Sequence, residues 1–186
     1  MNMKYLSRSM LVGLSLILAS TTASAIPLLN YSGSDVVGVT GLEVGGIAYD
    51  VSWQEGSYNA VFDTPGITPT FLGSSSGAQD AANALLGLFN SESLLPSGIG
   101  GLCTNDSFDC DFVIPWAVNA TRIDAFNVDW SQPGGPWVLQ PQNWSRDFDN
   151  DLVAMALFTR AVPEPATLAL LALGLVGIGA ARRRKN

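Results

Sequence analysis

Two uncharged apolar stretches, one near each end of the chain, limit which residues are available to fold. The first covers residues 10–19 and follows two cations, and the second covers residues 166–181 and precedes four cations. Both have the composition and flanks of membrane-directed segments rather than of a water-exposed surface. We therefore expect one domain over residues 26–161, which is long enough to bury a hydrophobic core.

The N-terminal stretch is typical of a secretory signal peptide. Cations come first, then the apolar residues 10–19, then small residues that end in Ala23-Ser24-Ala25. Signal peptidase accepts small side chains at both alanine positions, so Ala23 and Ala25 mark the predicted cleavage site and residues 1–25 the signal peptide. A permanent anchor is the alternative, but ten apolar residues are far fewer than the ~20 that span a bilayer.

The C-terminal stretch predicts a short transmembrane helix over residues 166–181. Its sixteen residues cover roughly 24 Å at a rise of ~1.5 Å each, a little less than the ~30 Å hydrocarbon core. The basic stop that follows marks the cytoplasmic side and consists of Arg182, Arg183, Arg184 and Lys185. A buried core helix is the alternative, but such a helix is not expected to run into RRRKN. Residues 26–161 are therefore expected outside the cytoplasm.

The charge of residues 26–161 excludes one class of partner. This segment contains fifteen acids and three arginines, a net charge of −12. Such a field repels phosphate backbones, so we expect no nucleic-acid partner. It favours solubility and attracts divalent cations.

The two cysteines, Cys103 and Cys110, enclose six residues. In an oxidising envelope such a pair predicts a disulfide, which should stabilise the fold by roughly 2.5 kcal/mol in the chain-entropy model. A structural zinc site is the alternative, but it needs four thiolate or imidazole ligands and the chain has no histidine. We expect no metal site and no cofactor.

Sheet signals dominate the body. Residues 47, 49, 51 and 53 alternate as one apolar face of a strand, and Gly45-Gly46 separates this strand from the run 39–44. A Gly-Gly pair favours a two-residue hairpin turn, so we expect a β-hairpin to open the domain. A polar turn over 54–59 and a short strand over 60–62 should follow.

One amphipathic helix is expected over residues 78–89, capped by Ser76 and favoured in its first turn by Asp80. It should end between residues 90 and 97, near Pro96. Further strands are expected at 112–118, 122–130, 137–140 and 152–161. The predicted fold class is α+β, a single domain of mainly antiparallel β-sheet with one helix.

Residues 162–186 resemble a known sorting signal. Pro163-Glu164-Pro165 is followed by a short Ala/Leu/Gly-rich helix and a terminal arginine cluster, and this order is similar to the PEP-CTERM sorting signal. The resemblance implies that an exosortase, an integral-membrane cysteine protease or transpeptidase-like enzyme, recognises the membrane-held precursor and removes or exchanges its tail near these three residues. It also implies a Gram-negative bacterium that makes exopolysaccharide. The segment GLEVGGIAYDVSW is similar to the start of domains in other proteins with this tail, without a known activity.

Two local patterns suggest chemistry that the rest of the sequence does not support. Residues 73–77 satisfy G-x-S-x-G, but a nucleophilic Ser75 needs a base, and the chain has no histidine and no lysine within the body. We interpret this segment as a flexible loop with a helix cap. Residues 147–151 have the D-x-D-x-D spacing of a calcium loop, but Leu152 and Phe158 replace the required glycine and glutamate. A solvated turn is the preferred interpretation, and weaker calcium binding here or near Asp106, Asp109 and Asp111 stays open.

Four tryptophans fall within 29 residues, together with several Asn and Asp side chains: Trp116, Trp130, Trp137 and Trp144. Aromatic faces beside such groups suit a saccharide. Core filling explains the same residues and is preferred. Several exposed tryptophans on one face would favour the saccharide.

The leading hypothesis is an exported cell-surface or extracellular-matrix protein, sorted by an exosortase and linked to exopolysaccharide or biofilm, with no catalytic residues. Its expected partners are signal peptidase, exosortase, exopolysaccharide and, before processing, the membrane. The alternative is a polysaccharide- or calcium-binding module permanently anchored in the inner membrane. An enzyme that uses carboxylates alone would need two facing acids in a cleft.

Overall fold

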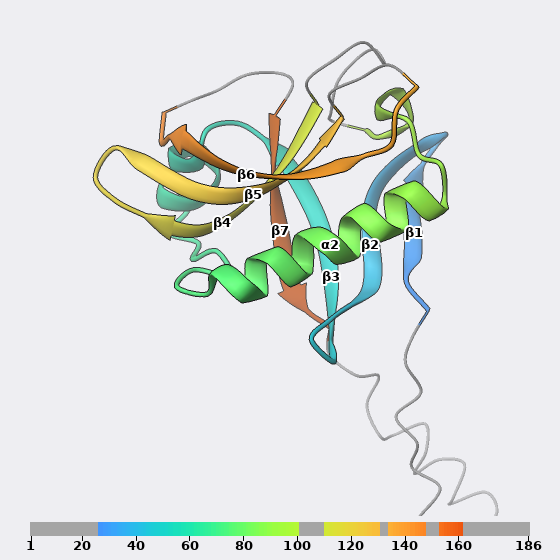
Figure 1. The fold of residues 1–186 in the computed structure, drawn as a ribbon, viewed down its shortest axis with the longest axis horizontal. Coiled ribbons are helices and arrows are strands. Elements are labelled where there is room, and N and C mark those ends of the chain that lie inside the picture. Colours follow the sequence, from blue (N-terminus) through green and yellow to red (C-terminus); the bar gives the residue numbers. More distant parts are fainter. Residues whose placement is uncertain (1–25, 101–109, 131–133, 148–152, 162–186) are drawn as a thin grey trace, which may run out of the picture.

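The computed structural model describes residues 26–100, 110–130, 134–147 and 153–161. These residues form one seven-stranded sheet with a single long helix across one face (Figure 1). The elements in chain order are β1 (Leu28–Ser32), β2 (Asp35–Val44), β3 (Ile47–Glu55), the π-helical turn η1 (Asn59–Asp63), α2 (Ser75–Ser91), the 3-10 turn η2 (Pro96–Gly98), β4 (Cys110–Val118), β5 (Arg122–Trp130), β6 (Val138–Ser145) and β7 (Val153–Arg160). The predicted single domain of mainly antiparallel sheet with one helix is confirmed.

The strands lie in the order β1-β2-β3-β7-β4-β5-β6. All neighbouring pairs are antiparallel except β4 and β7, which run parallel, with Asp111 opposite Val153. β7, the last strand of the described residues, therefore lies in the middle of the sheet, between β3 and β4.

The predicted Gly45-Gly46 hairpin is confirmed. Gly45 has φ 58° and Gly46 has φ 80°, and the flanking residues Val44 and Ile47 pair directly. Both positive φ values belong to a two-residue turn whose twist matches that of the strands, and glycine adopts them without a Cβ penalty.

Three expectations about the strands are wrong in detail. The hairpin does not open the domain, because β1 precedes it and pairs with β2. The segment expected as a strand over 60–62 lies within η1, since a short apolar run fits a helical turn as well as a strand. β6 continues to Ser145 rather than ending at 140, because it pairs with β5 from Arg122 to Asp129.

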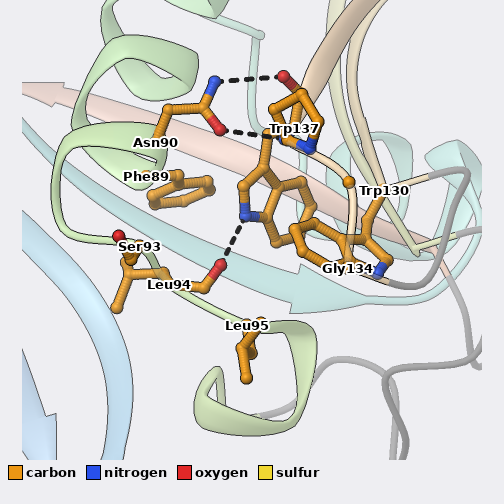
Figure 2. A pocket seen from close by; sticks show the side chains of 10 residues that line it. Phe89, Asn90, Ser93, Leu94, Leu95, Trp130, Gly134 and Trp137 are labelled. Atoms are coloured by element: carbon orange, nitrogen blue, oxygen red, sulfur yellow. Dashed lines mark hydrogen bonds between the residues drawn. The ribbon is translucent and has the colours of Figure 1, made fainter.

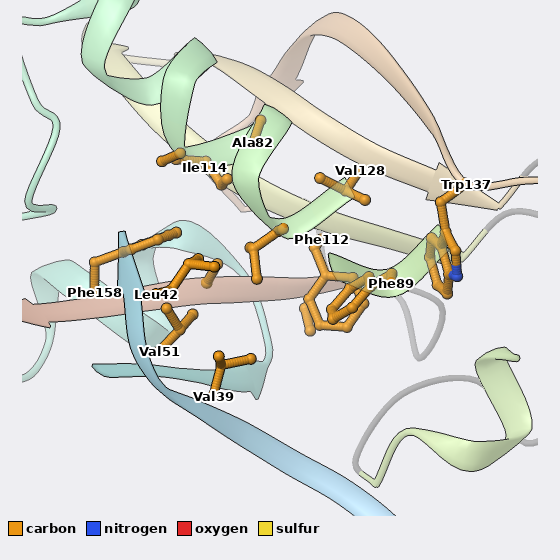
Figure 3. Packing of buried hydrophobic residues seen from close by; sticks show 14 of the residues in the cluster. Val39, Leu42, Val51, Ala82, Phe89, Phe112, Ile114, Val128, Trp137 and Phe158 are labelled. Atoms are coloured by element: carbon orange, nitrogen blue, oxygen red, sulfur yellow. The ribbon is translucent and has the colours of Figure 1, made fainter. Parts of the chain in front are cut away.

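The main core lies between α2 and the sheet. The helix contributes an apolar stripe of Ala78, Ala81, Ala82, Leu85 and Phe89, all fully buried. Phe89 lies at the centre of an aromatic group, 5.1 Å from the ring of Phe112 and 5.3 Å from that of Trp137 (Figure 3). Helix and sheet are thus joined mainly by burial of apolar side chains.

A second, smaller core lies on the opposite face of the sheet. It is made by residues of η1 and its flank together with alternate residues of β4, β5 and β7: Tyr58, Val61, Phe62, Val113, Ile123, Ala125, Val153 and Met155. Alternation places Phe112 and Ile114 against α2 and Val113 against η1. The central strands β4 and β7 are therefore apolar on both faces.

Candidate functional site

The sequence-predicted processing sites lie outside the described residues, as does the predicted helix over 166–181. They are Ala23, Ala25, Pro163, Glu164, Pro165, Arg182, Arg183, Arg184 and Lys185. No helix within the described part of the chain is long and apolar enough to cross a membrane. The described chain ends with the backbone N–H of Ala161 donating to the carbonyl of Ala48 at 2.9 Å. Two residues, Ala161 and Val162, thus separate the end of β7 from Pro163.

Cys110 is the first residue of β4 and is fully buried against the main core. No cysteine is free among the described residues, which agrees with a bonded Cys110. Its predicted partner, Cys103, lies outside the described residues, so the disulfide between them stays a prediction.

The G-x-S-x-G segment forms the start of α2. Ser74 is the N-cap, and its Oγ accepts a hydrogen bond from the N–H of Gly77 at 3.2 Å. The expected cap at Ser76 is therefore wrong by two residues, and Asp80 lies beyond the first turn. Ser75 is exposed. The interpretation as a helix cap is confirmed, but the expected flexible loop is wrong for Ser75, Ser76 and Gly77, which belong to α2.

The tryptophans contribute mainly to packing. Trp130 and Trp137 are 4% and 2% exposed, while Trp53, Trp116 and Trp144 are half-buried. Core filling is thus confirmed for Trp130 and Trp137. Exposed tryptophans on one face, which would have favoured a saccharide platform, do not occur in the described ranges.

An aromatic pocket of about 450 Å³ opens beside the C-terminal end of α2 (Figure 2). Trp137 is fixed there by three hydrogen bonds. Its N–H donates to Asn90 Oδ1 at 2.9 Å, its carbonyl accepts from Asn90 Nδ2 at 3.0 Å, and its Nε1 donates to the carbonyl of Leu94 at 2.8 Å. Ser93, at the same pocket, has the left-handed φ of 52°. A pocket of this size and lining can hold a small ligand with an apolar face.

A second depression, which we call the polar groove, lies on the sheet face opposite α2 and measures about 310 Å³. Its polar side chains come from four strands: Asn30, Thr40, Asp50, Ser52 and Thr159. Asn30 and Thr40 bond each other at 3.0 Å, and Asp50 Oδ1 accepts from the N–H of Gly41 at 3.0 Å. Such hydroxyl, amide and carboxylate groups suit the hydrogen-bonding of a hydroxyl-rich ligand.

Two carboxylates face each other across β4 and β5. Asp111 and Asp129 are directly paired and only 6% and 5% exposed, and Asp129 Oδ2 accepts from Gln140 Nε2 at 2.6 Å. A carboxylate-only enzyme would need such a pair within a cleft. Here both side chains are buried, so the pair does not offer an accessible catalytic site.

Arg146 forms a polar cluster at the end of β6. Its guanidinium pairs with Asp63, donates through Nε to Asn59 Oδ1 at 3.2 Å, and donates through Nη1 to the carbonyl of Asn119 at 3.0 Å. It also lies over the ring of Tyr58. Burial, and then the negative charge of Asp63, raise the pKa of the Tyr58 hydroxyl, while Arg146 acts in the opposite direction.

The Asp-rich segment is described only at its start. Asp147 accepts a hydrogen bond from Asn59 Nδ2, whereas Asp149 and Asp151 lie outside the described residues. Nor are Asp106 and Asp109 described. Within the described ranges no group of three or more His, Cys, Asp or Glu side chains could hold a metal ion.

Sequence reasoning singled out Trp130 and Trp137 of the aromatic pocket, but it missed the pocket's polar residues and the residues of the polar groove. Asn90 and Ser93 are distant in sequence from Trp137, and the polar groove draws on positions from Asn30 to Thr159. The clustering of tryptophans was the one signal that pointed toward the pocket.

Comparisons with known proteins find the C-terminal signal alone. Residues 161–185 match the family described as the PEP-CTERM protein-sorting motif. No curated protein and no solved structure matches the chain. The match begins at Ala161, directly after β7 ends at Arg160.

Proposed function

We propose that this protein serves at the cell surface or in the extracellular matrix. The chain carries a PEP-CTERM protein-sorting motif, which marks an exported protein of a Gram-negative bacterium with an exosortase as its processing partner. The task of this protein there is structural or adhesive rather than catalytic. The observation that carries the proposal is the motif at residues 161–185.

The junction between body and motif supports processing near Pro163-Glu164-Pro165. The sheet ends at Arg160, and Ala161 makes the last described backbone hydrogen bond. Pro163 and Pro165 follow Val162 in the sequence, and proline lacks the N–H donor that helix or sheet needs and favours an extended residue before it. A protease that binds extended substrates can therefore engage this segment without unfolding the sheet.

A non-catalytic role is supported by the composition of the body. Its residues include neither histidine nor lysine, so the common bases for an activated serine are missing. Ser75, the serine of the G-x-S-x-G pattern, is exposed and follows a capping residue.

The proposed link to exopolysaccharide is supported by the polar groove. Its Asn, Asp, Ser and Thr side chains supply both donors and acceptors to sugar hydroxyls. The net charge of −12 over residues 26–161 favours a neutral polysaccharide over an anionic one.

The decisive experiment replaces Pro163, Glu164 and Pro165 by alanine in the native host. The expected result is full-length precursor in the inner membrane and loss of the trimmed surface form, measured by fractionation and intact mass. A matched control replaces three exposed residues of the body, one of them a proline, and should be trimmed normally: Thr64, Pro65 and Thr68.

Neutralising the basic stop gives a separate readout. Replacing Arg182, Arg183, Arg184 and Lys185 by glutamine should weaken the membrane stop and release some untrimmed protein.

The alanine variant of Pro163, Glu164 and Pro165 decides the proposal. If this variant were trimmed and delivered as the wild type is, sorting would not read the tripeptide, and the proposed route would be wrong.

A further inference from the structure

The strand that leads to the sorting motif ends beside a hairpin turn. β7 runs antiparallel to β3 and ends with Arg160 opposite Tyr49. The backbone N–H of Ala161 then donates to the carbonyl of Ala48, the second residue of β3. Gly45-Gly46 forms the turn directly before β3. Figure 1 shows the tip of the β2–β3 hairpin and the arrowhead of β7 at the same lower end of the sheet, which we call the hairpin end.

The end of β7 is held firmly by its neighbours. Phe158 is 7% exposed, and its ring lies 5.1 Å from that of Phe71 and 6.1 Å from that of Tyr49. The hydroxyl of Thr70 donates to the carbonyl of Phe158. Fraying of the strand would break these contacts and expose the ring to water. A processing enzyme therefore gains little reach by loosening β7.

The distance from the sheet to the sorting tripeptide is limited by chain length. Only Val162 stands between Ala161 and Pro163, and two residues span at most about 7 Å. Chain geometry thus keeps Pro163 within roughly 20 Å of the Gly45-Gly46 turn. A small protein domain is about 30 Å across. An enzyme that engages the tripeptide must therefore come against the hairpin end.

The hairpin end offers a low surface to such an enzyme. Gly45 and Gly46 are exposed and carry no side chains, and a Cβ atom at either position would meet no other atom within 4 Å. The exposed charged side chains nearby have opposite signs, Glu43 and Arg160. Space in front of the turn is thus open, and the local charge is balanced although the body as a whole is acidic.

We propose that the hairpin end is the surface through which the folded body contacts the exosortase during processing. The inference rests on the proposed processing near Pro163-Glu164-Pro165 and adds which part of the body the enzyme touches. The partner is a membrane-held protease whose cleft must lie close to a folded sheet. A low two-residue turn admits it, and a bulky group at this turn excludes it.

The first test places the same bulk at either end of β2 in the full-length precursor, expressed in the native host. A small folded domain without tryptophan, inserted between Gly45 and Gly46, should slow trimming at least tenfold, measured by pulse labelling and intact mass. The matched control inserts this domain between Gly33 and Ser34, in the turn that precedes β2. The ten residues of β2 separate the two turns by about 33 Å, so the control should be trimmed at the wild-type rate.

A spacer distinguishes steric exclusion from misfolding. Exposed turns usually tolerate inserted domains, and Trp fluorescence checks the fold of each variant. About thirty Gly and Ser residues added between Ala161 and Val162 give a flexible reach of about 30 Å. The spacer should restore trimming of the Gly45-Gly46 insertion variant. A variant that stays untrimmed despite the spacer would contradict steric exclusion at the hairpin end.

Photo-cross-linking measures the contact directly. Benzoylphenylalanine in place of Glu43, beside the turn, should link the precursor to an exosortase whose nucleophilic cysteine has been replaced, because this enzyme binds its substrate without cutting it. The same group in place of Ser34, which is exposed in the opposite turn, should link at least tenfold less.

The outcomes separate this inference from the proposed function. Wild-type trimming of the Gly45-Gly46 insertion variant, or equal cross-linking from positions 43 and 34, would overturn the hairpin contact and leave exosortase processing intact. A wild-type precursor that is never trimmed in its host would overturn both.

Discussion

The guanidinium carbon of Arg146 lies 5.5 Å from the centre of the Tyr58 ring. With its bonds to Asp63, Asn59 and the carbonyl of Asn119, this one side chain joins η1 and its flank, the β4–β5 turn and the end of β6. It thereby holds η1 over the smaller core.

Arg146→Lys should destabilise the fold by about 1 kcal/mol. Lysine keeps the charge but loses the planar fork that bonds several acceptors and stacks on the ring. Urea unfolding measures the change. The control, Arg160→Lys, alters an exposed arginine and should lie within ~0.5 kcal/mol of wild type. Equal effects of the two substitutions would contradict the assigned role of Arg146.

Tyr58 should make the protein sensitive to alkali. Its pKa is raised in the fold by burial first and by Asp63 second, above the ordinary value of about 10. Below pH ~10 the hydroxyl is neutral in both states and the stability is complete. Above it the unfolded state loses its proton first, so stability falls as pH rises toward and through the folded pKa.

Tyr58→Phe removes this ionisation. Between pH 9 and 11 its unfolding free energy should fall less steeply than that of wild type, measured by denaturant titration at each pH. Tyr31→Phe alters an exposed ring and should keep the alkaline loss of wild type. An unchanged slope in Tyr58→Phe would show that another group controls the alkaline transition.

Substitutions of Ser74 and Ser75 at the start of α2 should differ in their effect on stability, because only Ser74 caps the helix. Ser74→Ala removes the side chain that accepts from Gly77 N–H and should cost about 1 kcal/mol. Ser75→Ala should leave stability within ~0.5 kcal/mol of wild type and should not change any hydrolytic activity toward esters. A loss of activity in folded Ser75→Ala would assign this serine a catalytic role.

A thiol-reactive label should modify neither Cys103 nor Cys110 in the natively exported protein, because the two cysteines are expected to form a disulfide. Reduction should lower the unfolding free energy by roughly 2.5 kcal/mol, the chain-entropy value for an eight-residue loop. Two reactive thiols in the folded protein would rule out the bond.

Short-range sequence patterns correctly predicted the turns, helices and strands whose structure depends mainly on neighbouring residues. Gly45-Gly46 required a backbone that glycine adopts without strain, and the hairpin formed there. The apolar stripe of α2 and the boundaries of β5 also followed from periodicity. The cap was misplaced because Ser74, Ser75 and Ser76 offer equivalent side chains, and only the backbone of Ser74, extended at φ −131°, selects among them.

Non-local pairing could not be predicted in the same way. β1 is short and lies at an edge, so it lacks a buried face with clear alternation. The parallel contact of β4 with β7 joins residues 111–113 to 153–155 across two intervening strands. Likewise, Asn90 meets Trp137 only because α2 crosses the sheet, and no spacing in the sequence encodes that crossing.

The central position of β7 has a mechanical consequence for a body tethered through its C-terminal tail. Any pull on the tail enters the sheet at Arg160, the end of a strand paired with β3 from Ala154 onward and with β4 at its start. Force along this strand loads many hydrogen bonds in shear at once, whereas an edge strand in the same place would peel away one pair at a time. In the proposed membrane-held precursor, a pull on the tail would therefore act on the strand that joins the two halves of the sheet, and the body should resist extraction until that whole strand yields.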